Sequence, residues 1–121
     1  MRSILAVAAL AMAFLGGPAA QDRVYLWDQP GAGITSPVLV KMVKANYTRA
    51  AMDRGVQGSV ELTVIVRKDG TVGDVTIKRS LDEDLDAEGI KATKQWTFRP
   101  GTKDGQPVNV QVNVELTFTL K

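Results

Sequence analysis

The chain has 121 residues, with 15 basic and 13 acidic side chains, no cysteine and no histidine. The lack of cysteine excludes disulfide bonds and a lipidated N-terminal cysteine, and a net charge of +2 gives no argument for nucleic acid or an anionic membrane surface as partner. The length allows a short leader and one domain of about 100 residues on a single hydrophobic core.

Residues 1–20 have the order of a secretory signal peptide. Arg2 precedes an apolar run over residues 4–15, and a Gly-Gly-Pro break and the small Ala19 and Ala20 precede the polar Gln21. Cleavage is expected after Ala19 or Ala20. An uncleaved membrane anchor is the alternative, but the apolar run spans only about 18 Å as a helix, against roughly 30 Å of hydrocarbon.

Residues 21–32 are interpreted as a linker, followed by one compact domain over residues 33–121. Residues 23–27, Arg-Val-Tyr-Leu-Trp, are compatible with a short extended piece to which the sequence assigns no role. Pro30 and the glycines around it then favour a turn.

The domain is expected to open with an extended segment and a short helix. Pro37 disfavours helix at the residue before it, so residues 38–43 are interpreted as extended. Helical spacing follows over about residues 46–54, and Gly55 lies where a helix C-cap is expected.

The clearest local signal is a β-hairpin. Apolar and polar side chains alternate from Val60 to Val66, Asp69-Gly70 follows as the turn, and Val75 and Ile77 resume the inward pattern.

A second helix is predicted from the capping-box pattern of Ser80 and Glu83 to about Lys94. Acidic residues gather at its start and lysines at its end, which suits the helix dipole. The alternate Asp82, Asp84 and Asp86 resemble the opening of a calcium loop, but the later Gly and Glu that such a loop needs are Ala87 and Thr93. The helix start is therefore the favoured interpretation. The side chains expected to pack on the sheet are Leu81, Leu85, Ile90 and Ala92, with Trp96 and Phe98 leading out of the helix.

The last segment alternates without interruption from Val108 to Leu120. Such a period of two predicts a long strand with one buried face. Burying its seven apolar side chains contributes about 10–20 kcal/mol gross, as an upper bound. If this strand lies at a sheet edge, it offers unpaired N–H and C=O groups to another chain.

These elements predict an α+β fold in two layers. The order is helix, strand, strand, helix, strand, with one antiparallel three-stranded sheet and both helices on one face. An extra short strand from the N-terminal segment is the alternative to three strands.

No enzyme site is expected. Without His or Cys the chain lacks the commonest bases and activated nucleophiles, although a Ser–Lys pair stays open. Gly70 and Gly73 lie in a hairpin and not before a helix, which argues against a phosphate cradle. We expect no catalytic residue, no cofactor and no metal.

Taken together, an ordered set of residues resembles the TonB C-terminal domain family. The resemblance covers about residues 33–121, and its most specific part is Trp96-x-Phe98-x-Pro100 between the acidic helix and the last strand. The other residues that carry it are Tyr47, Ala50-Ala51, Gly55, Gly58, the strand from Val60 to Val66, Asp69-Gly70, Val75, Ser80, Leu85-Asp86, Ile90 and the valine-rich final strand.

The resemblance implies a binding module of the bacterial cell envelope, located in the periplasm. Family members bind the TonB box, a short peptide of outer-membrane transporters, which adds as a strand beside the final strand in TonB-dependent transport. Because the charge is nearly balanced, no nucleic-acid partner is expected. The partner-binding residues that it implies here are Lys44, Tyr47, Val108, Asn109, Val110, Gln111, Val112, Asn113, Val114 and Glu115. For the polar members, an ordinary solvated strand face is the alternative.

Some features depart from the family pattern. Thr48 follows Tyr47 where many members have Pro, and Lys44 stands where well-known members have Gln. Complete energy transducers carry a membrane helix with a functional His, which contacts inner-membrane motor proteins, and a Pro-rich spacer. Here the stretch from Gln21 to Gly33 reaches only about 40 Å fully extended. Two alternatives to a periplasmic peptide binder therefore stay open. One is an inner-membrane transducer with an uncleaved N-terminus, and the other is a homodimer paired through the final strands.

Overall fold

The computed structural model describes residues 23–26 and 33–120. The expected signal peptide, residues 1–20, lies outside the described residues. The elements, in chain order, are β1 (Val24–Leu26), β2 (Val38–Lys41), α2 (Arg49–Asp53), β3 (Gly58–Val66), β4 (Val72–Arg79), α3 (Glu83–Thr93), β5 (Thr97–Arg99), β6 (Thr102–Lys103), β7 (Gln106–Pro107) and β8 (Asn109–Phe118).

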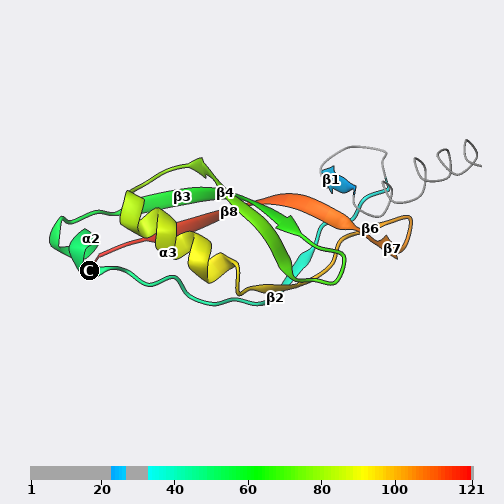
Figure 1. Ribbon diagram of the computed structural model, residues 1–121, viewed down its shortest axis with the longest axis horizontal. Coiled ribbons are helices and arrows are strands. Elements are labelled where there is room, and N and C mark those ends of the chain that lie inside the picture. Colours follow the sequence, from blue (N-terminus) through cyan, green and yellow to red (C-terminus); the bar gives the residue numbers. More distant parts are fainter. Residues whose placement is uncertain (1–22, 27–32, 121) are drawn as a thin grey trace, which may run out of the picture.

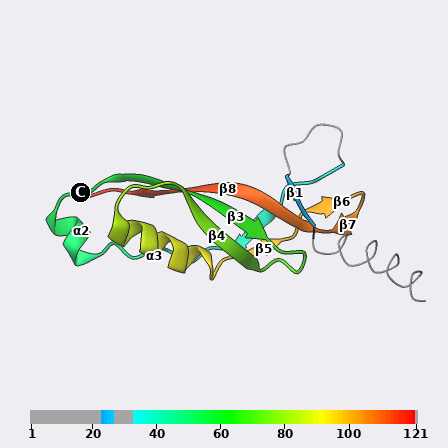
Figure 2. The same cartoon turned by 45° about the horizontal axis from the view of Figure 1, so that its top comes forward.

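The main sheet has four strands in the order β1-β8-β3-β4. β3 pairs antiparallel with β4 and along its whole length with β8, from Gly58 opposite Phe118 to Val66 opposite Val110. β1 is the extra N-terminal strand, and it joins β8 in parallel. The predicted α+β fold is confirmed, with a mixed sheet of four strands in place of an antiparallel one of three. Both helices lie in one layer beside the sheet (Figures 1 and 2).

The core lies between the sheet and α3. The inward side chains of β3 are fully buried, as the alternation predicts, and Leu85 of α3 packs among them. On β8 the burial is less complete than expected, because α3 packs chiefly against β3 and β4. Val110 and Phe118 are buried, whereas the inward side chains between them are half-buried: Val112, Val114 and Leu116.

Both helices begin later than the sequence patterns suggest. The Thr48 hydroxyl accepts a hydrogen bond from the N–H of Ala51 at 3.1 Å and caps α2, so residues 46–48 lie outside the helix. The expected cap Ser80 does not cap α3. Asp82 does, accepting from the N–H groups of Asp84 and Leu85 at 3.0 and 3.2 Å, because a carboxylate in this position complements the helix dipole better than a hydroxyl.

Ser80 instead donates its hydroxyl proton to the buried carboxylate of Asp86, one turn into α3. Asp86 also accepts from the N–H of Leu81 at 3.0 Å. The acidic cluster thus forms the start of a helix, which confirms the interpretation favoured over a calcium loop.

The segment after α3 connects three parts of the molecule. The indole N–H of Trp96 donates to the carbonyl of Val43 at 2.8 Å, in the stretch before α2. The N–H of Phe98 donates to the carbonyl of Gly70 at 2.8 Å, in the hairpin turn. Trp96-x-Phe98 therefore ties both the hairpin and the N-terminal stretch of the domain to α3.

In the described ranges, neither helix has the length and apolar character needed to cross a membrane.

Candidate functional site

The candidate site is the side of β8 that faces away from β3. There β1 covers only three positions, with Val24 aligned to Asn109, Tyr25 to Val110 and Leu26 to Gln111. From residue 112 to 118, no strand in the described part of the chain pairs with this side of β8. The backbone of that stretch is a free edge of a twisted sheet, which is where another extended chain can add as a strand.

The inward side chains of this edge belong to the core. Val110 is fully buried, and Val112 and Val114 are half-buried against the core cluster. Val112 and Val114 are thus available to a partner only along their outer rims, and any contact in this stretch is made chiefly by the backbone.

The outward side chains of β8 differ in their exposure and in their contacts with neighbouring strands. Asn113 and Glu115 are exposed, and Gln111 is half-buried beside β1. The side-chain oxygen of Asn113 accepts a hydrogen bond of 3.4 Å from the hydroxyl of Thr63 on β3. Glu115 lies opposite Glu61, whose charge is paired with Arg79 at 2.5 Å.

Asn109 is already engaged at the start of β8. Its side-chain oxygen accepts from the N–H of Lys68 in the hairpin loop at 2.9 Å, and its side-chain nitrogen donates to the carbonyl of Arg23 at 3.4 Å. Just before it, the N–H of Val108 donates to the carbonyl of Gly101 at 3.0 Å. These two residues therefore fix the position of the strand's beginning.

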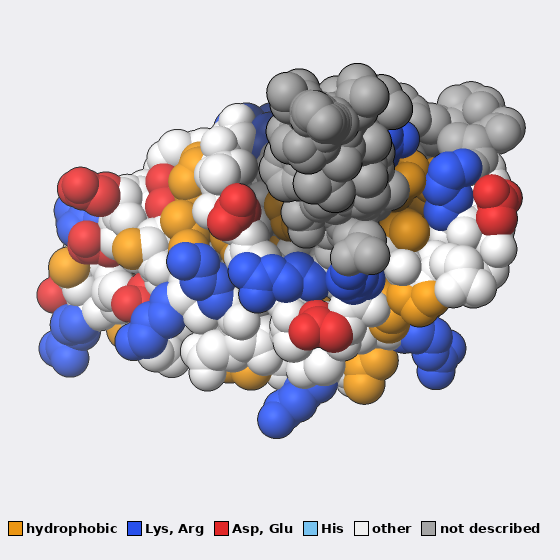
Figure 3. Space-filling model, turned by 45° about the vertical axis from the view of Figure 1, so that its right-hand side comes forward, with side chains coloured by type: hydrophobic (Ala, Val, Ile, Leu, Met, Phe, Trp, Pro, Cys, Tyr) orange, Lys and Arg blue, Asp and Glu red, His pale blue; other side chains and the backbone are white. Residues whose placement is uncertain are grey.

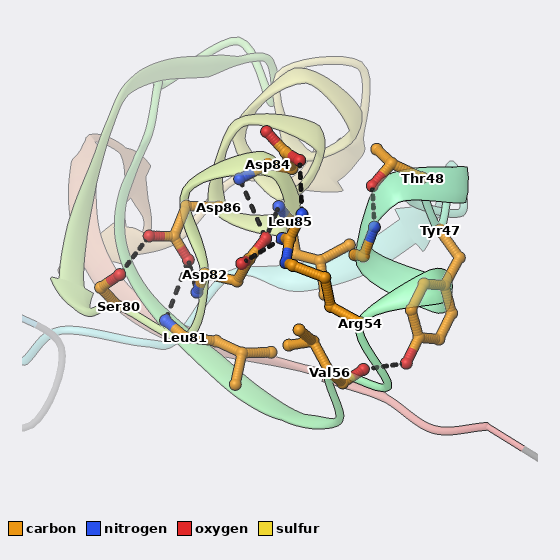
Figure 4. A network of polar contacts seen from close by, with 11 residues as sticks. Tyr47, Thr48, Arg54, Val56, Ser80, Leu81, Asp82, Asp84, Leu85 and Asp86 are labelled. Atoms are coloured by element: carbon orange, nitrogen blue, oxygen red, sulfur yellow. Dashed lines mark hydrogen bonds and ion pairs between the residues drawn. The ribbon is translucent and has the colours of Figure 1, made fainter.

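Tyr47 lies at the other end of β8. Its ring meets that of Phe118 edge-on, with the centroids 5.5 Å apart, and its hydroxyl donates to the carbonyl of Val56 (Figure 4). The structure thus joins Tyr47 to the last residue of the free edge. Lys44 is exposed and lines a pocket of about 140 Å³ with residues of α3, among them Glu88 and Lys91.

A charged network holds the end of the molecule that carries Tyr47. Arg54, which follows α2, reaches across to the start of α3, at 2.6 Å from Asp82 and 3.7 Å from Asp84 (Figure 4). Desolvation raises the pKa of Asp82, but hydrogen bonds from the Leu85 N–H and from Arg54 outweigh it, and the pKa lies below its ordinary value. The hydrogen bond to Asp82 also raises the pKa of Arg54, although desolvation opposes it.

Sequence reasoning missed two surface features. It assigned no role to the segment that forms β1, and gave an extra N-terminal strand only as an alternative, without its place beside β8. It also gave no sign that large apolar side chains would be exposed on β2, which pairs with β5, and just after it: Val38, Leu39, Val40 and Met42. On the face drawn in Figure 3, basic and acidic side chains are interspersed, so charge does not mark a separate site there.

Comparison with known proteins identifies the fold. The family model described as the Gram-negative bacterial TonB protein C-terminal matches residues 43–120. Protein TonB of Xanthomonas campestris pv. campestris is 39% identical over 75 residues, which are 61% of this chain and 34% of that protein. Protein tonB2 of Pseudomonas aeruginosa is 33% identical over 75 residues, which are 61% of this chain and 28% of that protein.

A solved structure agrees. The solution NMR structure of the Pseudomonas aeruginosa TonB CTD aligns with a TM-score of 0.58 and 26% identity, covering 76% of this chain and 91% of that one. The chain spans only about a third of the length of the curated relatives that it matches. The similarity to them is confined to their shared domain, and on the match over residues 43–120 the chain belongs to the family of Gram-negative bacterial TonB C-terminal domains.

Proposed function

We propose that this chain is a periplasmic peptide-binding module that adds a TonB-box-like strand of an outer-membrane transporter to β8, in TonB-dependent transport. The observation that carries the proposal is the free edge of β8 over residues 112–118 in a domain of the TonB C-terminal family. In this role the module captures its partner through the backbone, and no bond is made or broken.

The geometry supports strand addition in two respects. A peptide that pairs with residues 112–118 satisfies N–H and C=O groups that β1 leaves open, and such main-chain hydrogen bonds carry the affinity. Side chains of the added strand on the inner side would also cover the half-buried Val112 and Val114. Outward side chains of the partner would lie beside Asn113 and Glu115, which gives these two residues a part in selectivity.

Binding of synthetic TonB-box peptides, measured by fluorescence anisotropy, tests the proposal. Asn113→Lys places a long cation on the outward face of β8, and we expect it to weaken binding by about fivefold, a change of about 1 kcal/mol. Thr76→Lys is the matched control, because Thr76 aligns with Thr63, as Asn113 does, and so lies on the same face but on the far strand β4. It should leave the affinity within about twofold.

Equal effects of the two lysines, in proteins with unchanged circular dichroism, would contradict docking at β8. A wild-type protein that binds none of the peptides would contradict the function itself.

The proposed location makes a separate prediction. Cleavage after Ala19 or Ala20 should give a protein that begins at Ala20 or Gln21 and fractionates with the soluble periplasmic contents. N-terminal sequencing of the protein purified from its own cells checks this. A retained Met1 in the membrane fraction would instead support an anchored transducer.

A further inference from the structure

Part of the docking edge is occupied by the chain itself. β1 lies in parallel along β8 at positions 109–111, directly before the stretch 112–118 that the proposed function assigns to a partner. Backbone pairing at one side of a strand is exclusive, since each N–H and C=O group on that side has room for one neighbouring strand. A partner strand that extends to Gln111 or beyond therefore meets β1.

Specific contacts keep β1 in this place. The carbonyl of Arg23, the residue just before β1, accepts a hydrogen bond from the side chain of Asn109. The first residue of β8 therefore also holds the start of β1 in place. The ring of Tyr25, the middle residue of β1, is half-buried, with the ammonium group of Lys103 at 5.9 Å from its centre. On either side of it, Val24 and Leu26 are 42% and 39% exposed.

Within the described residues, the pairing of β1 is short. β1 has three residues and packs no side chain into the core cluster, whereas β3 pairs with β8 over nine positions. Ordering a short segment has an entropic cost that so few hydrogen bonds offset only narrowly. β1 is therefore expected to belong to the low-stability parts of the structure, which open without unfolding the rest.

We infer that the segment Val24–Leu26 is an internal competitor for the docking edge of β8. The inference rests on the proposed function, because it needs a partner at that edge. A partner strand that pairs only with residues 112–118 of β8 can bind while β1 stays paired with residues 109–111. A longer partner strand can bind only after β1 has dissociated from β8. For the longer strand, the apparent affinity falls in proportion to the fraction of molecules in which β1 is released.

Releasing β1 should strengthen binding. The probe is a labelled peptide with the sequence of residues 22–28, which offers the same strand in trans. Tyr25→Gly removes the one half-buried side chain of β1 and leaves β8 untouched. We expect it to bind this peptide at least about fivefold more tightly than the wild type does. Val40→Gly is the control, because it removes an exposed side chain of the edge strand β2, and it should bind as the wild type does.

Fixing β1 in place should do the opposite. The chain has no cysteine, so Leu26→Cys with Gln111→Cys introduces a single pair of thiols at aligned positions of β1 and β8. After oxidation we expect the affinity for the peptide to be at least about tenfold lower than in the same protein after reduction. Equal affinities, or failure of the disulfide to form, would overturn the inference.

Amide hydrogen exchange reports on β1 without any partner. In Tyr25→Gly, exchange should accelerate within residues 24–26 and 109–111 and stay unchanged at residues 60–66 of β3. Unchanged exchange at residues 24–26 would overturn the inference.

The two proposals fail in different ways. If the wild type and Tyr25→Gly bind TonB-box peptides and the trans peptide equally well, the competitor is excluded and the docking edge stands. If no variant binds either peptide, the docking edge is excluded, and the competitor with it.

Discussion

At the scale of single residues, Asp82 joins two helices through one carboxylate. One oxygen accepts from the N–H groups at the start of α3, and the other lies 2.6 Å from the guanidinium of Arg54 behind α2. The arrangement explains why Asp82, and not Ser80, caps the helix: only a charged acceptor serves both partners. It also makes the junction of the helices sensitive to acid.

The acid sensitivity follows from the direction of the pKa shift. Desolvation alone would raise the pKa of Asp82, but its hydrogen-bond donors lower it below the ordinary value of 3.8. Since the pKa is lower in the folded than in the unfolded chain, this carboxylate stabilises the fold fully above about pH 4. The contribution is lost as the pH falls through the lowered pKa.

Urea midpoints measured from about pH 6 to pH 2 check this expectation. Asp82→Asn keeps a good helix cap but cannot titrate, so its stability should fall less steeply with acid than that of the wild type. Some slope should remain, because the hydroxyl and N–H of Thr71 lower the pKa of Asp69 as well. Asp53→Asn, in an exposed pair with Arg49, is the control. Parallel curves for wild type and Asp82→Asn would contradict the role of Asp82.

At the scale of elements, the alternation of apolar and polar residues predicted the strands and the side chains that they bury. The alternation on β3 and β8 fixes which side chains face the core, and Asp69-Gly70 fixes the hairpin. Helix boundaries were less predictable, because Thr48 and Asp82 compete with neighbouring residues for the same cap positions. Partial burial of Val112 and Val114 was not predictable from the pattern, because it depends on where α3 lies across the sheet.

The hairpin turn shows how two elements constrain one residue. Gly70 has φ of 89°, and a Cβ atom there would lie 2.2 Å from the carbonyl oxygen of Phe98. Gly70→Ala should therefore destabilise the fold by roughly 2–4 kcal/mol, through both backbone strain and displacement of β5.

Gly105→Ala is the matched control for this prediction. Gly105 has a similar φ of 87°, but nothing lies within 4 Å of its Cβ position, so only the strain of about 1–2 kcal/mol applies. Chemical denaturation of both variants measures the difference. Equal losses of stability would show that the contact with Phe98 does not matter.

At the scale of the whole molecule, residues 33–120 hold the core, and β1 is attached to it from outside. None of the residues of β1 belongs to the core cluster. A chain of residues 33–121 should accordingly unfold cooperatively in urea, with a free energy of unfolding within about 1 kcal/mol of the chain that begins at Gln21. A shortened chain that unfolds without a cooperative transition would instead make β1 part of the folding unit.

The candidate site shows where prediction from sequence stops. The long final strand and its outward residues follow from the alternation, and the family resemblance adds the idea of a docking edge. That β1 lies on this edge could not be predicted, because three-residue pairing between positions far apart in sequence leaves no periodic signal. The burial of Tyr47 against Phe118 likewise depends on how α2 closes the end of the sheet.

The half-buried inner side of β8 has a thermodynamic consequence. Val112, Val114 and Leu116 pack against the core, yet water still reaches them, so under the proposed function the same apolar surface would contribute to folding and to capture of a strand. Any ligand that covers it binds the folded chain alone and shifts the unfolding equilibrium by mass action. At a hundredfold excess over its dissociation constant, such a ligand adds about 2.7 kcal/mol. A bound strand would thus protect this domain from heat and proteolysis, and the fraction of molecules with a bound partner would govern its lifetime.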